Sequence, residues 1–178
     1  MRSELRRAWL ASAWILGALL CAGCGPGVGG TGTGNDAAFA AFGANAGPVC
    51  SATVASELAC PSAPAGPVPP TGTLPVRFAD AAGQVVLELN GNVAQLDDSC
   101  LRLHFSGEFG TTAGGAQGFF GSYEIGGNGV DMLAALSIAP VAGGGSLTVG
   151  LRGVDGQMVV GPLPLQRATG PLPAPAPC

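Results

Sequence analysis

Apolar and polar side chains alternate along much of the chain, and this period-2 pattern predicts strands with one buried face. The clearest pair of strands is 74–78 and 85–89, which flank an Asp-Ala-Ala-Gly turn at 80–83. Pairing Phe78 with Val85 places the apolar side chains of both strands on one face. We therefore predict that register, because a slip of one residue would bury a glutamate instead.

The same pattern predicts further strands towards the C-terminus. A weak strand at 93–96 follows an Asn-Gly turn, and a long strand at 101–109 has its partner at 118–125. The stretch 130–138 is predicted as a strand from its neighbours. Its Met, Leu and Ala residues also favour a short helix, so both interpretations stay open.

The strongest hairpin signal is the Asp-Gly pair at 155–156. A two-residue turn at this point sets Leu151 opposite Val160 and Gly153 opposite Met158. Apolar positions again face apolar positions, so the sequence is consistent with this register.

About seven short strands, separated by Gly and Asp turns, describe an all-β domain. We predict a small antiparallel β-sandwich, immunoglobulin-like in outline, with a closed up-and-down β-barrel as the alternative. Pro162 and Pro164 near the end suit an edge strand, because proline cannot donate to a ladder.

The first two dozen residues have a different pattern. Three arginines precede an apolar run at 8–20 that ends in Cys21-Ala22-Gly23-Cys24. A positive start, an apolar core and small residues before a cut are typical of a secretory signal. The cysteine after Ala22-Gly23 resembles the lipobox of bacterial lipoproteins, and this resemblance implies cleavage before Cys24 and a lipid on that cysteine. Arg6-Arg7 also resembles a twin-arginine export motif, so the export route stays open.

These features divide the chain into five parts. They are a signal peptide at 1–23, a lipidated cysteine with a Gly/Thr-rich tether at 24–34, a short helical and Pro-rich segment at 35–72, the β domain at 73–167 and a Pro-rich tail at 168–178. A helix through Ala37–Phe42, with Phe39 and Phe42 on one face, is predicted after Asn35 or Asp36 as its cap. The anchor implies the bacterial cell envelope, with the outer membrane favoured over the inner.

Composition narrows the partners of the folded part. Beyond residue 23 the chain has four arginines, no lysine and ten acidic residues, a net charge of −6. Such a chain lacks the basic stripe that phosphates require, which argues against nucleic acid. Trp9 and Trp14 both belong to the signal, so Tyr123 and the phenylalanines are the only aromatic side chains beyond it. The expected partners are the membrane, through the lipid, and an envelope protein.

Four cysteines remain beyond the lipidation site, at Cys50, Cys60, Cys100 and Cys178. An even number in an oxidising compartment predicts two disulfides, and the spacings lack the clustered ligands of a zinc site. A local Cys50–Cys60 bridge would leave Cys100 to hold Cys178. A continuous helix between Cys50 and Cys60 would separate them too far for a bridge, so the connectivity stays open.

Two motifs are candidates for chemistry. Residues 126–133 fit one copy of the calcium nonapeptide of repeat-in-toxin proteins, with Asp131 as the candidate ligand. The ion in that family sits between stacked repeats, so a Gly-rich hairpin loop is the competing interpretation. His104, the only histidine, is predicted on an outward strand face beside Arg102 and Ser106. There is no Gly-x-Ser-x-Gly elbow, and we expect no cofactor.

The sequence thus predicts a lipid-anchored envelope protein that presents a small non-catalytic β domain as a binding or structural module. The alternative is a carrier that holds a small apolar ligand inside a β-barrel. A hydrolase is the least favoured interpretation. An interior cavity would distinguish the carrier from the module, because a carrier needs a pocket of ~300 Å³ or more.

Overall fold

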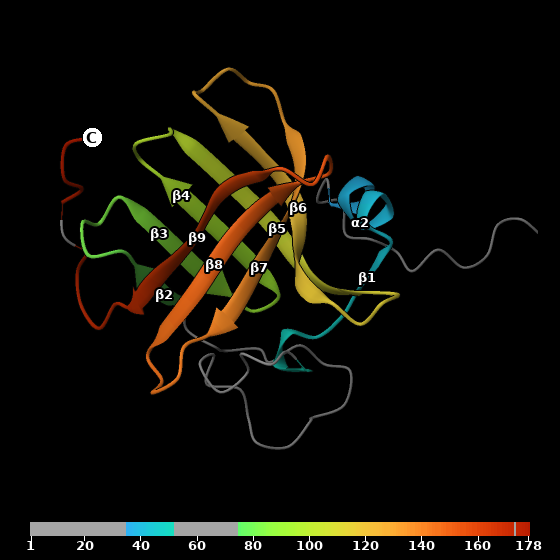
Figure 1. Ribbon diagram of the computed structural model, residues 1–178, viewed down its shortest axis with the longest axis horizontal. Helices are drawn as coiled ribbons and strands as arrows, with labels where there is room; N and C mark the ends of the chain where they lie inside the picture. Colours follow the sequence, from blue (N-terminus) through green and yellow to red (C-terminus); the bar gives the residue numbers. More distant parts are fainter. Residues whose placement is uncertain (1–34, 52–74, 173) are drawn as a thin grey trace, which may run out of the picture. The chain divides into compact units, whose positions relative to one another are not determined.

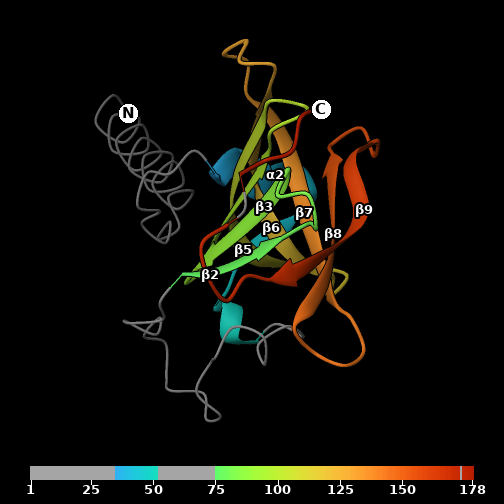
Figure 2. The same cartoon turned by 90° about the vertical axis from the view of Figure 1, so that its left-hand side faces the viewer.

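The computed structural model describes residues 35–51, 75–172 and 174–178 (Figures 1 and 2). The predicted signal, Cys24, the tether and Cys60 lie outside these residues. The elements are α2 (Asp36–Phe42), β1 (Ala44–Ala46), the 3-10 turn η1 (Val49–Ser51), β2 (Val76–Ala79), β3 (Val85–Asn90), β4 (Val93–Asp98), β5 (Leu103–Thr112), β6 (Gln117–Ile125), β7 (Met132–Pro140), β8 (Ser146–Gly153) and β9 (Met158–Arg167).

Strands β2 to β9 form a closed antiparallel barrel of eight strands. Each strand pairs with the next along the chain, and β9 returns to pair with β2. The β-sandwich prediction is therefore wrong, and the alternative of a closed up-and-down barrel is confirmed. The physical reason is that each of these strands pairs with a strand on both of its sides. A sandwich would need a break in this pairing, where one sheet ends and the other begins.

Inward-facing side chains form one cluster inside the barrel. Its largest fully buried members are Phe78, Phe105, Phe109, Phe119, Leu87, Leu96, Leu136, Leu147, Leu151, Leu165 and Val149. The rings of Phe109 and Phe119 meet edge to face, with centroids 5.5 Å apart. The interior of an eight-stranded barrel is just wide enough for side chains to fill, and here large apolar side chains occupy it.

The β2–β3 hairpin keeps the predicted face but not the predicted register. Phe78 lies opposite Leu87, not Val85. In the described residues the inward positions are those predicted, whereas Leu74 of the predicted strand lies outside them. The cause is Asp80, whose backbone N–H donates to the Val85 carbonyl and whose Oδ1 accepts the Val85 N–H at 2.9 Å. These bonds shorten the turn by two residues, and a shift of two preserves the inward face.

The β8–β9 hairpin confirms one predicted pair and corrects another. Leu151 lies opposite Val160 and both are buried, but Met158 lies opposite Arg152 instead of Gly153. The turn has three residues, because the Gly153 N–H donates to the Gln157 carbonyl. Gly156, with φ of 80°, supplies the left-handed position that this turn requires. A bulge then restores the Leu151 register.

The other strand predictions are largely confirmed. The long strand is β5, it pairs with β6 as predicted, and the stretch with two interpretations is strand β7. Two starts differ from the prediction: Val130 lies exposed in the loop before β7, and Leu101 lies exposed in a turn and not in β5. Asp98 Oδ1 accepts the N–H groups of Cys100 and Leu101, and these bonds hold the turn that delays the start of the strand.

Strands β5 and β6 carry two facing glycines. Gly107 lies opposite Gly121 in the register. A Cβ placed on Gly121 would overlap the Ser106 carbonyl oxygen, and one placed on Gly107 would overlap the Phe105 ring. The neighbouring groups lie this close only because neither residue has a side chain.

The segment 35–51 packs onto the barrel. Helix α2 forms as predicted, and Phe39 and Phe42 both contact Phe120 on β6, with ring centroids 5.6 and 5.5 Å from it. Asn35 occupies the N-cap position, although its side chain makes no capping bond. Val49 joins the interior cluster, and its N–H donates to the side chain of Asn92 at 2.8 Å. The helix thus covers the outer side of β6, while Val49 reaches the interior beside the turn between β3 and β4.

Cys100 and Cys178 form a disulfide, which confirms one of the predicted pairings. Their Cα atoms are 5.4 Å apart, within the normal range. Cys50 is also disulfide-bonded. Cys60, which was predicted as its local partner, lies outside the described residues. The Cys100–Cys178 bridge returns the Pro-rich tail to the turn between β4 and β5.

Candidate binding site at the barrel seam

The barrel closes through fewer pairs between β2 and β9 than along its other ladders. Two register pairs join these strands, Phe78 with Arg167 and Ala79 with Gln166. One more bond follows, in which the Ala168 N–H donates to the Arg77 carbonyl at 2.8 Å. Beyond Ala79, β2 ends in a turn while β9 continues alongside β8. In the described residues, this part of β9 has no strand partner on its outer edge.

Pro164 protects that open edge. The N–H of Arg167 donates towards β8, to Gly145, and the N–H of Ala168 donates towards β2. Backbone groups alternate sides along a strand, so Pro164 directs its nitrogen to the β2 side. Proline has no N–H, which fits the predicted edge role. On the β2 side, the backbone at Pro164 therefore offers a carbonyl acceptor but no donor.

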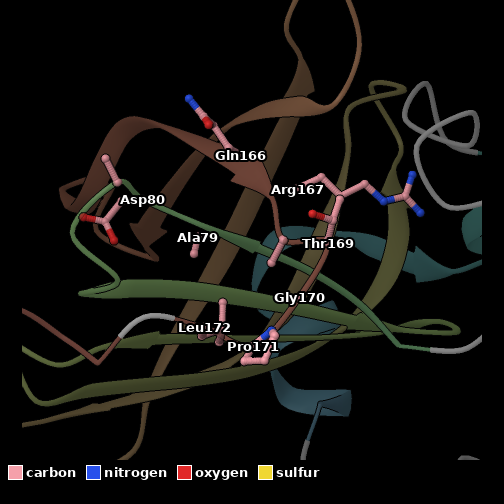
Figure 3. Close-up of a pocket in the computed structure, with 10 residues that line it drawn as sticks. Ala79, Asp80, Gln166, Arg167, Thr169, Gly170, Pro171 and Leu172 are labelled. Atoms are coloured by element: carbon pink, nitrogen blue, oxygen red, sulfur yellow. The ribbon is translucent and has the colours of Figure 1, made fainter.

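A hollow of about 350 Å³ lies where β2, β9 and the tail meet. Its walls come from the end of β2, the end of β9 and tail residues 168–172. Figure 3 shows Asp80 and Arg167 on opposite sides of it, with Pro171 and Leu172 on the tail side. Ala79 points outward from β2 and is nevertheless buried, so the tail covers this part of the barrel wall.

Three contacts hold the end of the tail, at the β2–β3 and β4–β5 turns. The Ala176 N–H donates to the Ala82 carbonyl at 3.1 Å. The Gln84 side-chain amide donates to the carbonyls of Ala176 and Pro177, each at 3.3 Å. The Cys100–Cys178 disulfide fixes the end covalently. The outer wall of the hollow is therefore ordered by the barrel itself.

The groups around the hollow are mixed. Small apolar side chains alternate with four polar ones, which belong to Asp80, Gln166, Arg167 and Thr169. The Asp80 carboxylate already accepts the Val85 N–H. A small ligand with polar groups at both ends would suit this arrangement.

His104 lies on the outer face of the barrel, as predicted. Its Nδ1 is 2.7 Å from Asp97 Oδ1, and both side chains are more than half exposed, at 57% and 60%. The register places Glu124 of β6 on the other side of His104. This is a solvated cross-strand pair on the outer face of the barrel.

Asp131 lies in the exposed loop between β6 and β7. Asn128 Oδ1 accepts the Val130 N–H at 3.0 Å, and Glu124 Oε1 accepts the Gly129 N–H at 2.7 Å. The carboxylate and amide oxygens here are thus used to hold the loop. Within the part of the chain that the structure describes, no three His, Cys, Asp or Glu residues are close enough to hold a metal ion.

Sequence reasoning missed the hollow because it treated residues 168–178 as a tail, although it predicted that Cys100 could hold Cys178. That bridge was the available signal, since it folds the tail back onto the barrel. Cys24, the predicted lipidation site, lies outside the described residues. The helix described here is too short to cross a membrane, and no other helix in the described ranges could do so.

Comparisons of the chain with protein families, with curated proteins and with solved structures give no match.

Proposed function

We propose that this chain is a lipid-anchored protein of the bacterial cell envelope, and that its barrel is a binding or structural module without catalytic activity. The observation that carries the second part is the filled interior, where four phenylalanines and several leucines are fully buried. A carrier needs room for its ligand among such side chains. The hollow at the seam shares no residue with this interior cluster. Binding on the outside of the barrel is therefore better supported than transport within it.

The anchor rests on the N-terminal sequence. An apolar run at 8–20 leads directly to Ala22-Gly23-Cys24, and lipid on Cys24 would hold the barrel at a membrane of the envelope. The outer membrane is favoured over the inner. The partner is then another envelope protein, or a small polar ligand in the hollow.

Fractionation of cells that express the Cys24→Ala variant tests the anchor. The variant should leave the membrane pellet, because it loses the residue that carries the lipid. Cys21→Ala is the matched control: it changes a cysteine of the same motif that lies before the cut, and this variant should stay in the pellet. A Cys24→Ala protein that sediments as firmly as the parent contradicts the proposal.

Titration of the purified protein with an apolar, environment-sensitive fluorophore tests the module against the carrier. A filled interior should give no saturable binding. Saturable one-to-one binding by the folded protein would instead support the carrier, since an apolar ligand could then enter the barrel.

A further inference from the structure

One end of the barrel carries a row of exposed apolar side chains. Six large hydrophobic side chains are exposed in the described residues. Four of them lie in or beside the turns at this one end: Leu101, Val130, Val154 and Met158. We call these four residues the apolar rim. The two remaining residues, Val93 and Val141, lie at or near the opposite end.

The three turns of the apolar rim are neighbours, not scattered points. The Gly126 N–H donates to the Arg102 carbonyl at 3.0 Å, so the β6–β7 loop contacts the β4–β5 turn. Ala134 pairs with Gly153, which places the start of β7 beside the β8–β9 turn. Figure 2 shows these loops projecting from the same end of the barrel.

The loops hold their apolar tips in the solvent. Gly129-Val130-Asp131 and Gly153-Val154-Asp155 are the same tripeptide, and their valines are 54% and 56% exposed. Asn128 Oδ1 accepts the Val130 N–H, and Asp155 Oδ1 accepts the Gln157 N–H at 2.9 Å. Side chain to backbone bonds of this kind fix the loop conformation, so the valines stay exposed without conformational rearrangement.

Charge around the apolar rim is net negative. Four acids, Asp98, Glu124, Asp131 and Asp155, lie in or beside its three turns, together with two arginines, Arg102 and Arg152. The Glu124 carboxylate accepts the Gly129 N–H, and the Arg152 guanidinium donates to the Gly156 carbonyl. The excess of acids repels anionic lipid, so a zwitterionic headgroup layer is the membrane surface that these short apolar tips can approach.

We infer that the apolar rim docks the barrel onto a zwitterionic phospholipid surface, such as one rich in phosphatidylethanolamine. This inference rests on the proposed anchor at Cys24. Eleven residue steps separate Cys24 from Asn35, so the chain between them reaches at most ~40 Å. Four side chains alone bind a membrane weakly, but a tether of this length keeps them at a high effective concentration near the surface. The lipid thus supplies attachment and the apolar rim supplies orientation.

The chain has no tryptophan beyond residue 14, so a single introduced tryptophan can serve as a fluorescent probe of its own position. The full chain is expressed with Val154→Trp, purified with its lipid and reconstituted into phosphatidylethanolamine and phosphatidylcholine vesicles. The emission of the Val154→Trp probe should shift to shorter wavelength and be quenched by brominated lipid. Val141→Trp, which replaces an exposed valine near the other end, is the matched control and should show neither effect. Val130→Trp provides a second position on the apolar rim.

Each other outcome overturns the inference. Unshifted emission at positions 154 and 130 in protein that co-sediments with vesicles refutes the docking and leaves the anchor intact. A shift at position 141 as well shows that the barrel has no preferred orientation. Protein that does not co-sediment, or a parent chain that still has tryptophan emission, refutes the proposed processing and the docking with it. Probes that are exposed on vesicles but protected in intact cells indicate a protein partner instead of the membrane.

Discussion

The β5–β6 ladder and the β2–β9 seam close the same barrel in different ways. Nine register pairs, from Leu103 with Ile125 to Thr111 with Gln117, join β5 to β6, and two facing glycines let the backbones approach. Two register pairs join β2 to β9, and the tail with its disulfide forms a strap beside them. The comparison teaches that one ladder is paired along its whole length, whereas the other has a short ladder and a strap outside it. The seam is also where the hollow forms.

The largest expected effect tests whether β9 is fixed in the core despite its open edge. Val160→Asp places a charge among the interior side chains, where Val160 is 4% exposed, and should lower the free energy of unfolding by about 4 kcal/mol. Val159→Asp is the matched control. Val159 is only partly buried, so its loss should be clearly smaller. Thermal melting measures both, and an equal or larger loss at Val159 would mean that the inward face is wrongly assigned.

The next effect tests the ladder. Gly121→Ala introduces a Cβ that overlaps the Ser106 carbonyl oxygen, and backbone cannot move aside cheaply. We expect a loss of about 3 kcal/mol in the free energy of unfolding. Gly114→Ala, in the turn between the same strands, has an open site whose nearest neighbour is Thr112 Oγ1 at 3.8 Å, and it should change stability little. Denaturant titration of both variants checks the prediction, which fails if they unfold together.

The strap should matter at the seam and little elsewhere. Replacing Cys100 and Cys178 by serine removes a bridge between residues 78 apart, which should lower stability by about 2 to 4 kcal/mol. Hydrogen exchange should become faster at Ala168, whose N–H bonds across the seam, before it does in β5 and β6. Uniform loss of protection would show that the two closures are equally strong. In the parent protein, neither cysteine should react with a thiol reagent after denaturation without reductant.

The smallest effect concerns the surface of the short strands. Arg77 Nε lies 2.6 Å from Glu88 Oε2 across β2 and β3, and the side chains are 53% and 27% exposed. Exposed ion pairs contribute little, so Arg77→Ala should lower stability by less than ~0.5 kcal/mol. A double-mutant cycle with Glu88→Ala measures the pair alone. A coupling above ~1 kcal/mol would mean that the seam depends on this pair as well as on the strap.

The parts of this fold that the sequence predicts are those that depend on the local pattern of apolar and polar residues. Period-2 alternation identified the strands and the inward positions, because one face of each strand is buried. The registers at Asp80 and Gly156 were missed, since turn length depends on a side chain to backbone bond in one case and a left-handed residue in the other. The pairing of β2 with β9 joins the two ends of the ladder, and no local pattern encodes it. The hollow depends on the same closure.

The open edge of β9 also bears on the order of folding. Hairpins between successive strands make local contacts and form fast, whereas β2 meets β9 only after all the strands between them are in place. Until then each end strand of the curled sheet has one unpaired edge. Pro164 withholds a donor from the free side of β9 throughout this interval. Pro164 leaves the seam of the folded barrel without one donor. The same missing donor therefore protects the partly folded barrel from aggregation before β2 and β9 pair.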